Sequence, residues 1–324
     1  MIQLGPIALR YPVMLAPLAG ITDLPFRRLV GDFGAAMVVS EMIASQEVLL
    51  NRPEARARAE LGFGEVATAV QLAGRDPYHM AEAARWCEGQ GARIIDINMG
   101  CPAKRVTTGA CGSALMRDLP RALRLIEAVI GAVDLPVTLK TRLGWDGGSL
   151  NAPELARMAE GAGIRMITIH GRTRCQLYKG TADWRAVRAV KEAVSISVIV
   201  NGDIIDSNSA QVALSDSGAD GVMIGRGAQG RPWQLARIAH DLFGASAPVV
   251  PQGPDLAWMI IGHYRAILDF YGPELGLRCA RKHLGWYLDA AGLPQLRGAL
   301  LRLEDPDEVC RRIDDIFATA CLAA

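Results

Sequence analysis

Residues 94–102 read IIDINMGCP, a short apolar run that ends abruptly in polar and turn-forming residues. The run Ile94–Ile97 is typical of a buried β-strand, and the strand ends beside Asn98 and Cys101, two side chains that can do chemistry. The same pattern recurs through the first three quarters of the chain. The eight apolar runs are Val13–Leu15, Met37–Val39, Thr68–Leu72, Ile94–Ile97, Val137–Lys140, Met166–Ile169, Ser197–Val200 and Gly221–Ile224.

Stretches with helical patterning separate these runs. They include Met80–Glu88, Arg121–Ile130, Ala152–Glu160, Asp183–Ala193 and Ser209–Ser215. Strands that alternate with helices predict a parallel sheet. Eight such units predict a closed (β/α)8 TIM barrel, because an open doubly wound sheet normally has fewer strands. The sequence therefore predicts an α/β fold of the TIM-barrel class.

A segment rich in Pro and Gly, GASAPVVPQGP, covers residues 244–254 and predicts a linker. It separates a barrel domain, residues 1–243, from residues 255–324, which lack further strand patterns. The helices expected in this last part are Leu256–Phe270, Glu274–Ala290 and Asp307–Cys321. The sequence therefore predicts a C-terminal all-helical domain.

The composition argues against several classes of protein. The seven cysteines include no CxxC pair, so we expect neither a disulfide framework nor a metal site, and a reducing cytoplasm fits best. No apolar run reaches the ~18 residues of a membrane span, and no secretory leader is recognisable. The net charge is only +1, and residues 241–324 hold 8 Lys and Arg against 11 Asp and Glu. Any binding of nucleic acid must therefore depend on a local basic patch.

The ends of the last two strands predict a phosphate site, because active sites of TIM barrels lie where strands end. Asn201, Gly202 and Asp203 follow the seventh run, and Gly225 and Arg226 follow the eighth. The glycines allow close backbone approach and Arg226 adds positive charge. Two ordinary glycine turns beside a surface arginine are the alternative. The string GRGAQG (225–230) also matches GxGxxG, but no strand follows it to complete a dinucleotide-binding unit.

Three side chains are expected to face the barrel mouth. Lys140 ends the fifth run, and a buried cation needs an anionic partner, which could be a reduced flavin or a carboxylate such as Glu41. Gln71 could bond the pyrimidine edge of a flavin or be a satisfied core amide. His170 is a candidate flavin contact or general acid, with a structural hydrogen bond as the alternative.

Cys101 is the candidate acid, because a thiol with a pKa near ~8.5 is mostly protonated at neutral pH. A small buried hydrophobic residue is the alternative. Lys104 follows it, and then the loop Thr107–Gly112, a candidate lid that contains the unassigned Cys111.

The helix expected over Glu274–Ala290 predicts a basic stripe for gripping RNA. At about 100° per residue, its members fall within an arc of roughly 100°. A solvated face of an ordinary helix is the alternative. The stripe consists of Arg278, Arg281, Lys282 and Gly285.

Taken together, these strings resemble the bacterial tRNA-dihydrouridine synthases over nearly the whole chain. The matching strings are APLAGITDLPFR (16–27), SEM (40–42), QLAG (71–74), DINMGCPAKRV (96–106), GSALM (112–116), LKTRLGW (139–145), TIHGRTR (168–174), NGDI (201–204) and MIGRGAQGRPW (223–233). QGRPW and the later RKHLGWY (281–287) look most like the B branch. The chain departs from many members at Leu18, where they have Met.

The resemblance implies an FMN-binding barrel that uses NADPH to reduce a uridine of tRNA at C5–C6, with Cys101 as proton donor to C5. The residues that would hold FMN are Pro17, Leu18, Ala19, Gln71, Lys140, His170, Asn201, Gly202, Asp203, Gly225 and Arg226. The residues that would contact the uridine or the rest of the tRNA are Asn98, Lys104, Arg142, Arg172, Arg278, Arg281 and Lys282. The B-branch likeness suggests position 17 of the D-loop as the target, and we expect a monomer.

Three other functions fit parts of the pattern. An FMN barrel that acts on a free pyrimidine, of the dihydroorotate or dihydropyrimidine dehydrogenase type, would share the phosphate site and the lysine. A barrel lyase or isomerase would use Lys140 as a Schiff base and hold no flavin. A non-catalytic RNA-binding barrel would leave Cys101 and Lys140 without a purpose.

Overall fold

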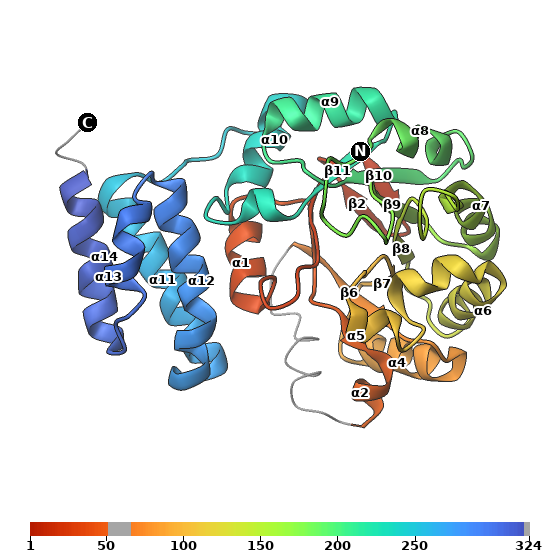
Figure 1. Ribbon diagram of the computed structural model, residues 1–324, viewed down its shortest axis with the longest axis horizontal. Coiled ribbons are helices and arrows are strands. Elements are labelled where there is room, and N and C mark those ends of the chain that lie inside the picture. The colour runs from red at the N-terminus through yellow and green to blue at the C-terminus, as the bar shows by residue number, and fades with distance from the viewer. Residues whose placement is uncertain (51–65, 321–324) are drawn as a thin grey trace.

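The computed structural model describes residues 1–50 and 66–320. Eight parallel strands form a closed barrel, since the order β4-β3-β11-β10-β9-β8-β7-β6 is completed by pairing of β4 with β6 (Figure 1). The strands are β3 (Val13–Leu15), β4 (Met37–Val39), β6 (Ala67–Ala73), β7 (Ile94–Met99), β8 (Val137–Arg142), β9 (Met166–His170), β10 (Ser197–Asn201) and β11 (Gly221–Ile224). The short β5 (Ile43–Ala44) adds to the end of β6. The predicted TIM barrel is confirmed.

Helices surround the barrel as expected for β/α units (Figure 1). They are α1 (Leu24–Asp32), α2 (Ser45–Leu49), α4 (Pro77–Gly89), α5 (Lys104–Thr107), α6 (Leu119–Ile130), α7 (Ala152–Ala162), α8 (Arg185–Lys191), α9 (Ser207–Ser217) and α10 (Gln234–Phe243), with 3-10 turns at Gly112–Arg117 and Arg226–Ala228. Local sequence explains where several begin. Asp23, Asp76 and Asp118 cap the first turns of α1, α4 and α6, and each of these helices has a proline in its first turn.

An antiparallel hairpin that the sequence analysis missed lies at the N-terminus. Its strands are β1 (Ile2–Leu4) and β2 (Ile7–Leu9), and both are buried on alternate residues. The hairpin packs in one cluster with Ile94 and Met166, the first residues of β7 and β9. It therefore covers the amino end of the barrel and leaves the carboxyl ends of the strands to form a site.

The chain after the barrel is helical, as predicted. Residues 244–252 contain no helix or strand, and then follow α11 (Gly253–Tyr271), α12 (Pro273–Ala290), a 3-10 turn (Pro294–Leu296), α13 (Arg297–Leu300) and α14 (Pro306–Ala320). Cys321, the predicted end of the last helix, lies outside the described residues. These helices share a hydrophobic core of their own. Among the described residues, no helix is both long enough and apolar enough to cross a membrane.

The helical part packs against the α1 side of the barrel (Figure 1). The ring of Phe26 in α1 lies 5.7 Å from the ring of His263 in α11 and 5.2 Å from that of His283 in α12. Lys282 of α12 also donates a hydrogen bond to the carbonyl of Gly20, in the loop after β3. The loop that begins at Pro17 is thus held from the helical part of the chain.

Candidate active site

A cavity of about 1080 Å³ opens at the carboxyl ends of the barrel strands. It brings together residues from every part of the barrel. All eleven predicted cofactor residues line it: Pro17, Leu18, Ala19, Gln71, Lys140, His170, Asn201, Gly202, Asp203, Gly225 and Arg226. Cys101 and three of the predicted substrate residues, Asn98, Lys104 and Arg142, line it as well. The other four predicted substrate residues do not.

Lys140 is fixed by an amide, not by a carboxylate. Its Nζ lies 3.0 Å from Oδ1 of Asn201, whose Nδ2 donates to the Met223 carbonyl at 2.8 Å. Within the described residues Lys140 forms no ion pair, and Glu41 instead accepts from the backbone N–H of Gly20. Burial lowers the pKa of Lys140 to about 8, so the amine is mostly cationic at neutral pH. The cavity thus contains a cation placed to meet an anionic ligand.

Gln71 is a member of a buried hydrogen-bonded chain and also faces the cavity. Its Nε2 donates to Oδ2 of Asp96 and its Oε1 accepts from Nδ2 of Asn98, both at 2.7 Å. Asp96 was missed by sequence reasoning, although a charge inside the apolar run Ile94–Ile97 is itself a signal. Both expected roles of Gln71, core amide and cavity group, are therefore compatible with its position.

Cys101 is half-buried in a turn that is held on both sides. Its backbone N–H donates to Oδ1 of Asn98 at 2.9 Å, and its carbonyl accepts from the Ser113 hydroxyl at 2.9 Å. Gly112, at φ +58°, must lack a side chain, because a Cβ there would lie 2.8 Å from the Cys101 carbonyl oxygen. The candidate lid, residues 107–112, thus packs against this turn. Burial raises the pKa of the Cys111 thiol in the same segment.

Arg172 occupies a structural position instead of the predicted tRNA contact. It is 1% exposed and does not line the cavity. Its guanidinium donates to both carboxylate oxygens of Asp203 and to the Gly180 carbonyl at 2.6 Å. Asp203 in turn accepts from Arg226 at 3.0 Å. These contacts therefore fix the orientation of the Arg226 guanidinium. Burial opposes ionisation, but the hydrogen bond from Arg172 holds the pKa of Asp203 below its usual value.

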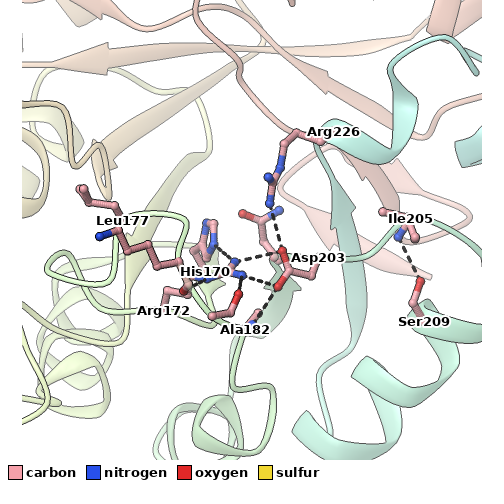
Figure 2. A network of polar contacts seen from close by, with 12 residues as sticks. His170, Arg172, Leu177, Ala182, Asp203, Ile205, Ser209 and Arg226 are labelled. Carbon is pink, nitrogen blue, oxygen red and sulfur yellow. Dashed lines mark hydrogen bonds and ion pairs between the residues drawn. The ribbon is translucent and has the colours of Figure 1, made fainter. Parts of the chain in front are cut away.

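The surroundings of His170 hold its ring in the neutral form, so either expected role, flavin contact or general acid, would use a neutral imidazole. Burial lowers its pKa to about 2, and surrounding cations, of which Lys140 has the largest effect, add to the shift. Nη1 of Arg172 lies 3.3 Å from Nε2 of His170 (Figure 2). A guanidinium can only donate, so Nε2 accepts and the proton lies on Nδ1. His170 can still contact a ligand through the face or edge of its ring.

Arg142 joins two loops of the cavity wall. It is 2% exposed and donates at 2.9 Å to the carbonyls of Gly100, Thr173 and Leu177. Burial lowers its pKa to about 10, so it stays charged at neutral pH. Its guanidinium lies 5.6 Å from the ring centre of Tyr178, a mostly exposed residue that sequence reasoning did not single out.

The predicted stripe on α12 is split between different environments. Arg278 is exposed, whereas Arg281 is half-buried and points its Nη2 toward the Leu303 carbonyl at 3.5 Å. Lys282 donates a hydrogen bond to the Gly20 carbonyl, as described above. Gly285 is buried, with Arg297 3.0 Å from the position of a Cβ. Helical periodicity alone could not show this, because neighbouring helices cover part of the face.

Comparison with known proteins bears directly on this site. A sequence model described as Dihydrouridine synthase (Dus) matches residues 14–321. The chain is 59% identical over 319 residues to a probable tRNA-dihydrouridine synthase from Rhodobacter capsulatus, with 98% of each chain covered. It is 44% identical over 319 residues to tRNA-dihydrouridine synthase B from Pseudomonas aeruginosa, covering 98% of this chain and 96% of that protein. Because the family model spans residues 14–321 and these relatives match over almost their whole length, the chain belongs to the dihydrouridine synthase family.

Proposed function

We propose that the chain reduces the C5–C6 bond of a D-loop uridine in tRNA, with FMN as its cofactor and NADPH as reductant. Membership of the dihydrouridine synthase family makes the chain a tRNA-modifying oxidoreductase. The observation that carries the finer proposal is that the Cys101 thiol shares one cavity with all eleven residues expected to hold FMN. Similarity to tRNA-dihydrouridine synthase B agrees with the B-branch likeness of the sequence, from which we propose position 17 as the target.

The cavity fits a flavin phosphate at the ends of β10 and β11. A Cβ on Gly225 would project between Leu18 and Ala16, at 3.6 and 3.7 Å, so the missing side chain leaves that part of the cavity open. No hydrogen bond from the backbone N–H of Gly225 or Arg226 is found within the described residues. Free N–H groups beside an arginine are suited to a phosphate.

The remaining residues supply position and one proton. Bound FMN would supply the hydride that C6 of the uracil receives. The thiol of Cys101 gives a proton to C5, which completes the saturation of the double bond, and solvent returns a proton to the thiolate afterwards. Lys140, as a buried cation, favours a negatively charged ring system beside it.

The rim of the cavity suits an RNA backbone. A uracil must leave its stack before it can enter a barrel, and unpaired loop nucleotides do so at the lowest cost. Lys104 and Arg105 are exposed at the rim, and Arg174 is half-buried there. Together with Arg278 on α12, they are the cations that we assign to tRNA phosphates.

Each described cysteine is a free thiol, which supports action in the reducing cytoplasm. We propose that the protein acts there as a monomer.

Dihydrouridine mapping in cellular tRNA tests the proposed function. Cells without this protein should lack the modification at position 17 of tRNAs that otherwise carry it, and the wild-type chain should restore it. The purified protein should be yellow and release FMN on denaturation. An unchanged modification map, or a colourless protein that takes up no FMN, would contradict the proposal.

A further inference from the structure

In the turn that carries Cys101, the backbone N–H and carbonyl groups of both Gly100 and Cys101 are paired. The Gly100 carbonyl accepts from Nε of Arg142 at 2.9 Å, and the Cys101 carbonyl accepts from the N–H and hydroxyl of Ser113 at 3.1 and 2.9 Å. The N–H groups of Gly100 and Cys101 both donate to Oδ1 of Asn98, at 3.1 and 2.9 Å. The N–H side of the turn thus depends on one oxygen atom.

That oxygen faces the turn only if the Asn98 amide is correctly oriented. Rotation by 180° would present its NH₂ group to two other N–H groups, which cannot bond to it. The observed orientation is fixed by Gln71, whose Oε1 accepts from Nδ2 of Asn98 at 2.7 Å. Gln71 is also an amide with two ends, so its own orientation needs a further partner.

Asp96 supplies that partner. Its Oδ2 accepts from Nε2 of Gln71 at 2.7 Å, and its Oδ1 accepts from the Thr138 hydroxyl at 2.6 Å. Gln71, Asp96 and Thr138 are direct neighbours on β6, β7 and β8. Burial raises the pKa of Asp96, but a proton on the carboxyl group could lie on Oδ1, where Thr138 can accept it. The oxygen that faces Gln71 therefore accepts in either protonation state.

We propose that Asp96 is a positioning residue that fixes, through Gln71 and Asn98, the turn that presents Cys101 to the substrate. In this hydrogen-bonded chain Asp96, Gln71 and Asn98 are 3%, 1% and 8% exposed, so water has little access to replace its members. The proposal deepens the function proposed above, since it concerns the residue assigned there as proton donor.

Two substitutions at Asp96 separate hydrogen bonding from charge. Asp96→Leu has a similar branched shape but accepts no hydrogen bond. Asp96→Asn also loses the charge, yet it can keep an oxygen toward Gln71 if its NH₂ group faces the Thr138 hydroxyl. Thr138→Val is the matched control, because it removes the other hydrogen bond of Asp96 and leaves the one to Gln71 intact.

The measurement is the rate of iodoacetamide alkylation at Cys101, followed by peptide mass spectrometry on the folded full chain. Exposed Cys175 is the internal standard and half-buried Cys111 reports wider loosening. Asp96→Leu should raise the alkylation rate of Cys101 about fivefold. Loss of one net hydrogen bond increases the population of the open, reactive form of the turn by about that factor. Asp96→Asn and Thr138→Val should stay within about twofold of the parent. This readout needs neither FMN nor tRNA, so it stands apart from the proposed function.

Activity gives the second readout. With tRNA as substrate, Asp96→Leu should lower kcat more than it changes KM, and Asp96→Asn should restore most of kcat. Equal behaviour of Asp96→Leu and Asp96→Asn, or a parallel rise at Cys111, would overturn the proposal in favour of a charge effect or general loosening. If Asp96→Leu does not fold, Gln71→Met interrupts the same chain, and an unchanged Cys101 rate in that variant would overturn the proposal equally.

Discussion

Lys140 is the residue at which burial and charge most directly affect the proposed chemistry. Since burial lowers its pKa to about 8, its positive charge is present at neutral pH and is lost as the pH rises through that value. Lys140→Met should lower the two-electron reduction potential of bound FMN by about 30 mV or more at pH 7, the equivalent of about 1.4 kcal/mol.

Spectroelectrochemical titration of parent and variant measures this effect. The difference between the two potentials should shrink once the pH exceeds the pKa of Lys140 in the complex, because the parent then loses the charge that the variant lacks. An anionic flavin beside the amine raises that pKa above the value of about 8. Lys140→Arg, which keeps a cation, is the control. Identical potentials in the parent and Lys140→Met at pH 7 would show that the lysine does not act on the flavin.

Which residues gather at the site could be predicted from their places after the strands, but their individual partners could not. Arg172 was expected to contact the RNA, yet it is buried and donates to the Asp203 carboxylate. His170 was a candidate acid, yet its ring is held neutral. These outcomes depend on side chains from different strands that approach only in the folded barrel. Asp96 is the exception, since a carboxylate inside an apolar run can be noticed in the sequence.

At the scale of elements, the turn after β10 imposes a requirement for glycine. Gly202 has a φ of +113°, and a Cβ there would lie 2.9 Å from the Cβ of Ala182 and 3.1 Å from the His170 ring. Gly202→Ala should therefore destabilise the protein by about 1–3 kcal/mol and weaken FMN binding. Gly161→Ala, within α7 and with open space around it, should instead stabilise by up to about 1 kcal/mol. Urea unfolding of both variants checks this; equal effects would contradict the steric argument.

The strands and helices themselves were largely predictable, because each apolar run is flanked by turn residues and each expected helix has its own periodicity. The N-terminal hairpin β1–β2 was missed, although residues 2–9 alternate between buried and exposed positions on each strand. Its strands have three residues each, which is too short for the period to stand out. Its role in covering the barrel depends on contacts with Ile94 and Met166, far away in sequence.

At the scale of the whole molecule, the seam between barrel and helical part, where Phe26 contacts His263 and His283, should make the protein sensitive to acid. Burial lowers the pKa of His263 to about 3 and holds that of His283 well below 6.5. Between about pH 6.5 and 3 the unfolded chain therefore binds more protons at these sites, so acidification favours unfolding. Burial raises the pKa of Asp23 at the same seam to about 6, which opposes this trend between pH 6 and 3.8.

Over all the described residues, three histidines have lowered pKa values, His170, His263 and His283. They outnumber the buried carboxyl groups of Asp23 and Asp96, whose pKa values are raised. The free energy of unfolding should therefore fall as the pH decreases from 7 to 5. Each histidine can contribute up to about 1.4 kcal/mol per pH unit below its unfolded-state pKa. Urea titrations at a series of pH values measure how steeply the free energy of unfolding depends on pH. His283→Leu should reduce the number of protons taken up on unfolding by about one. A free energy that stays constant from pH 7 to 5 would refute this account of the seam.

The central claim is that Cys101 donates the proton that the uracil receives at C5, and rapid kinetics tests it most directly. In Cys101→Ala, FMN content and the rate of flavin reduction by NADPH should match the parent, because neither step uses the thiol. Reoxidation of the reduced enzyme by unmodified tRNA should slow by about 10²-fold or more, the usual contribution of a general acid. Reoxidation at the parental rate in Cys101→Ala would contradict the claim.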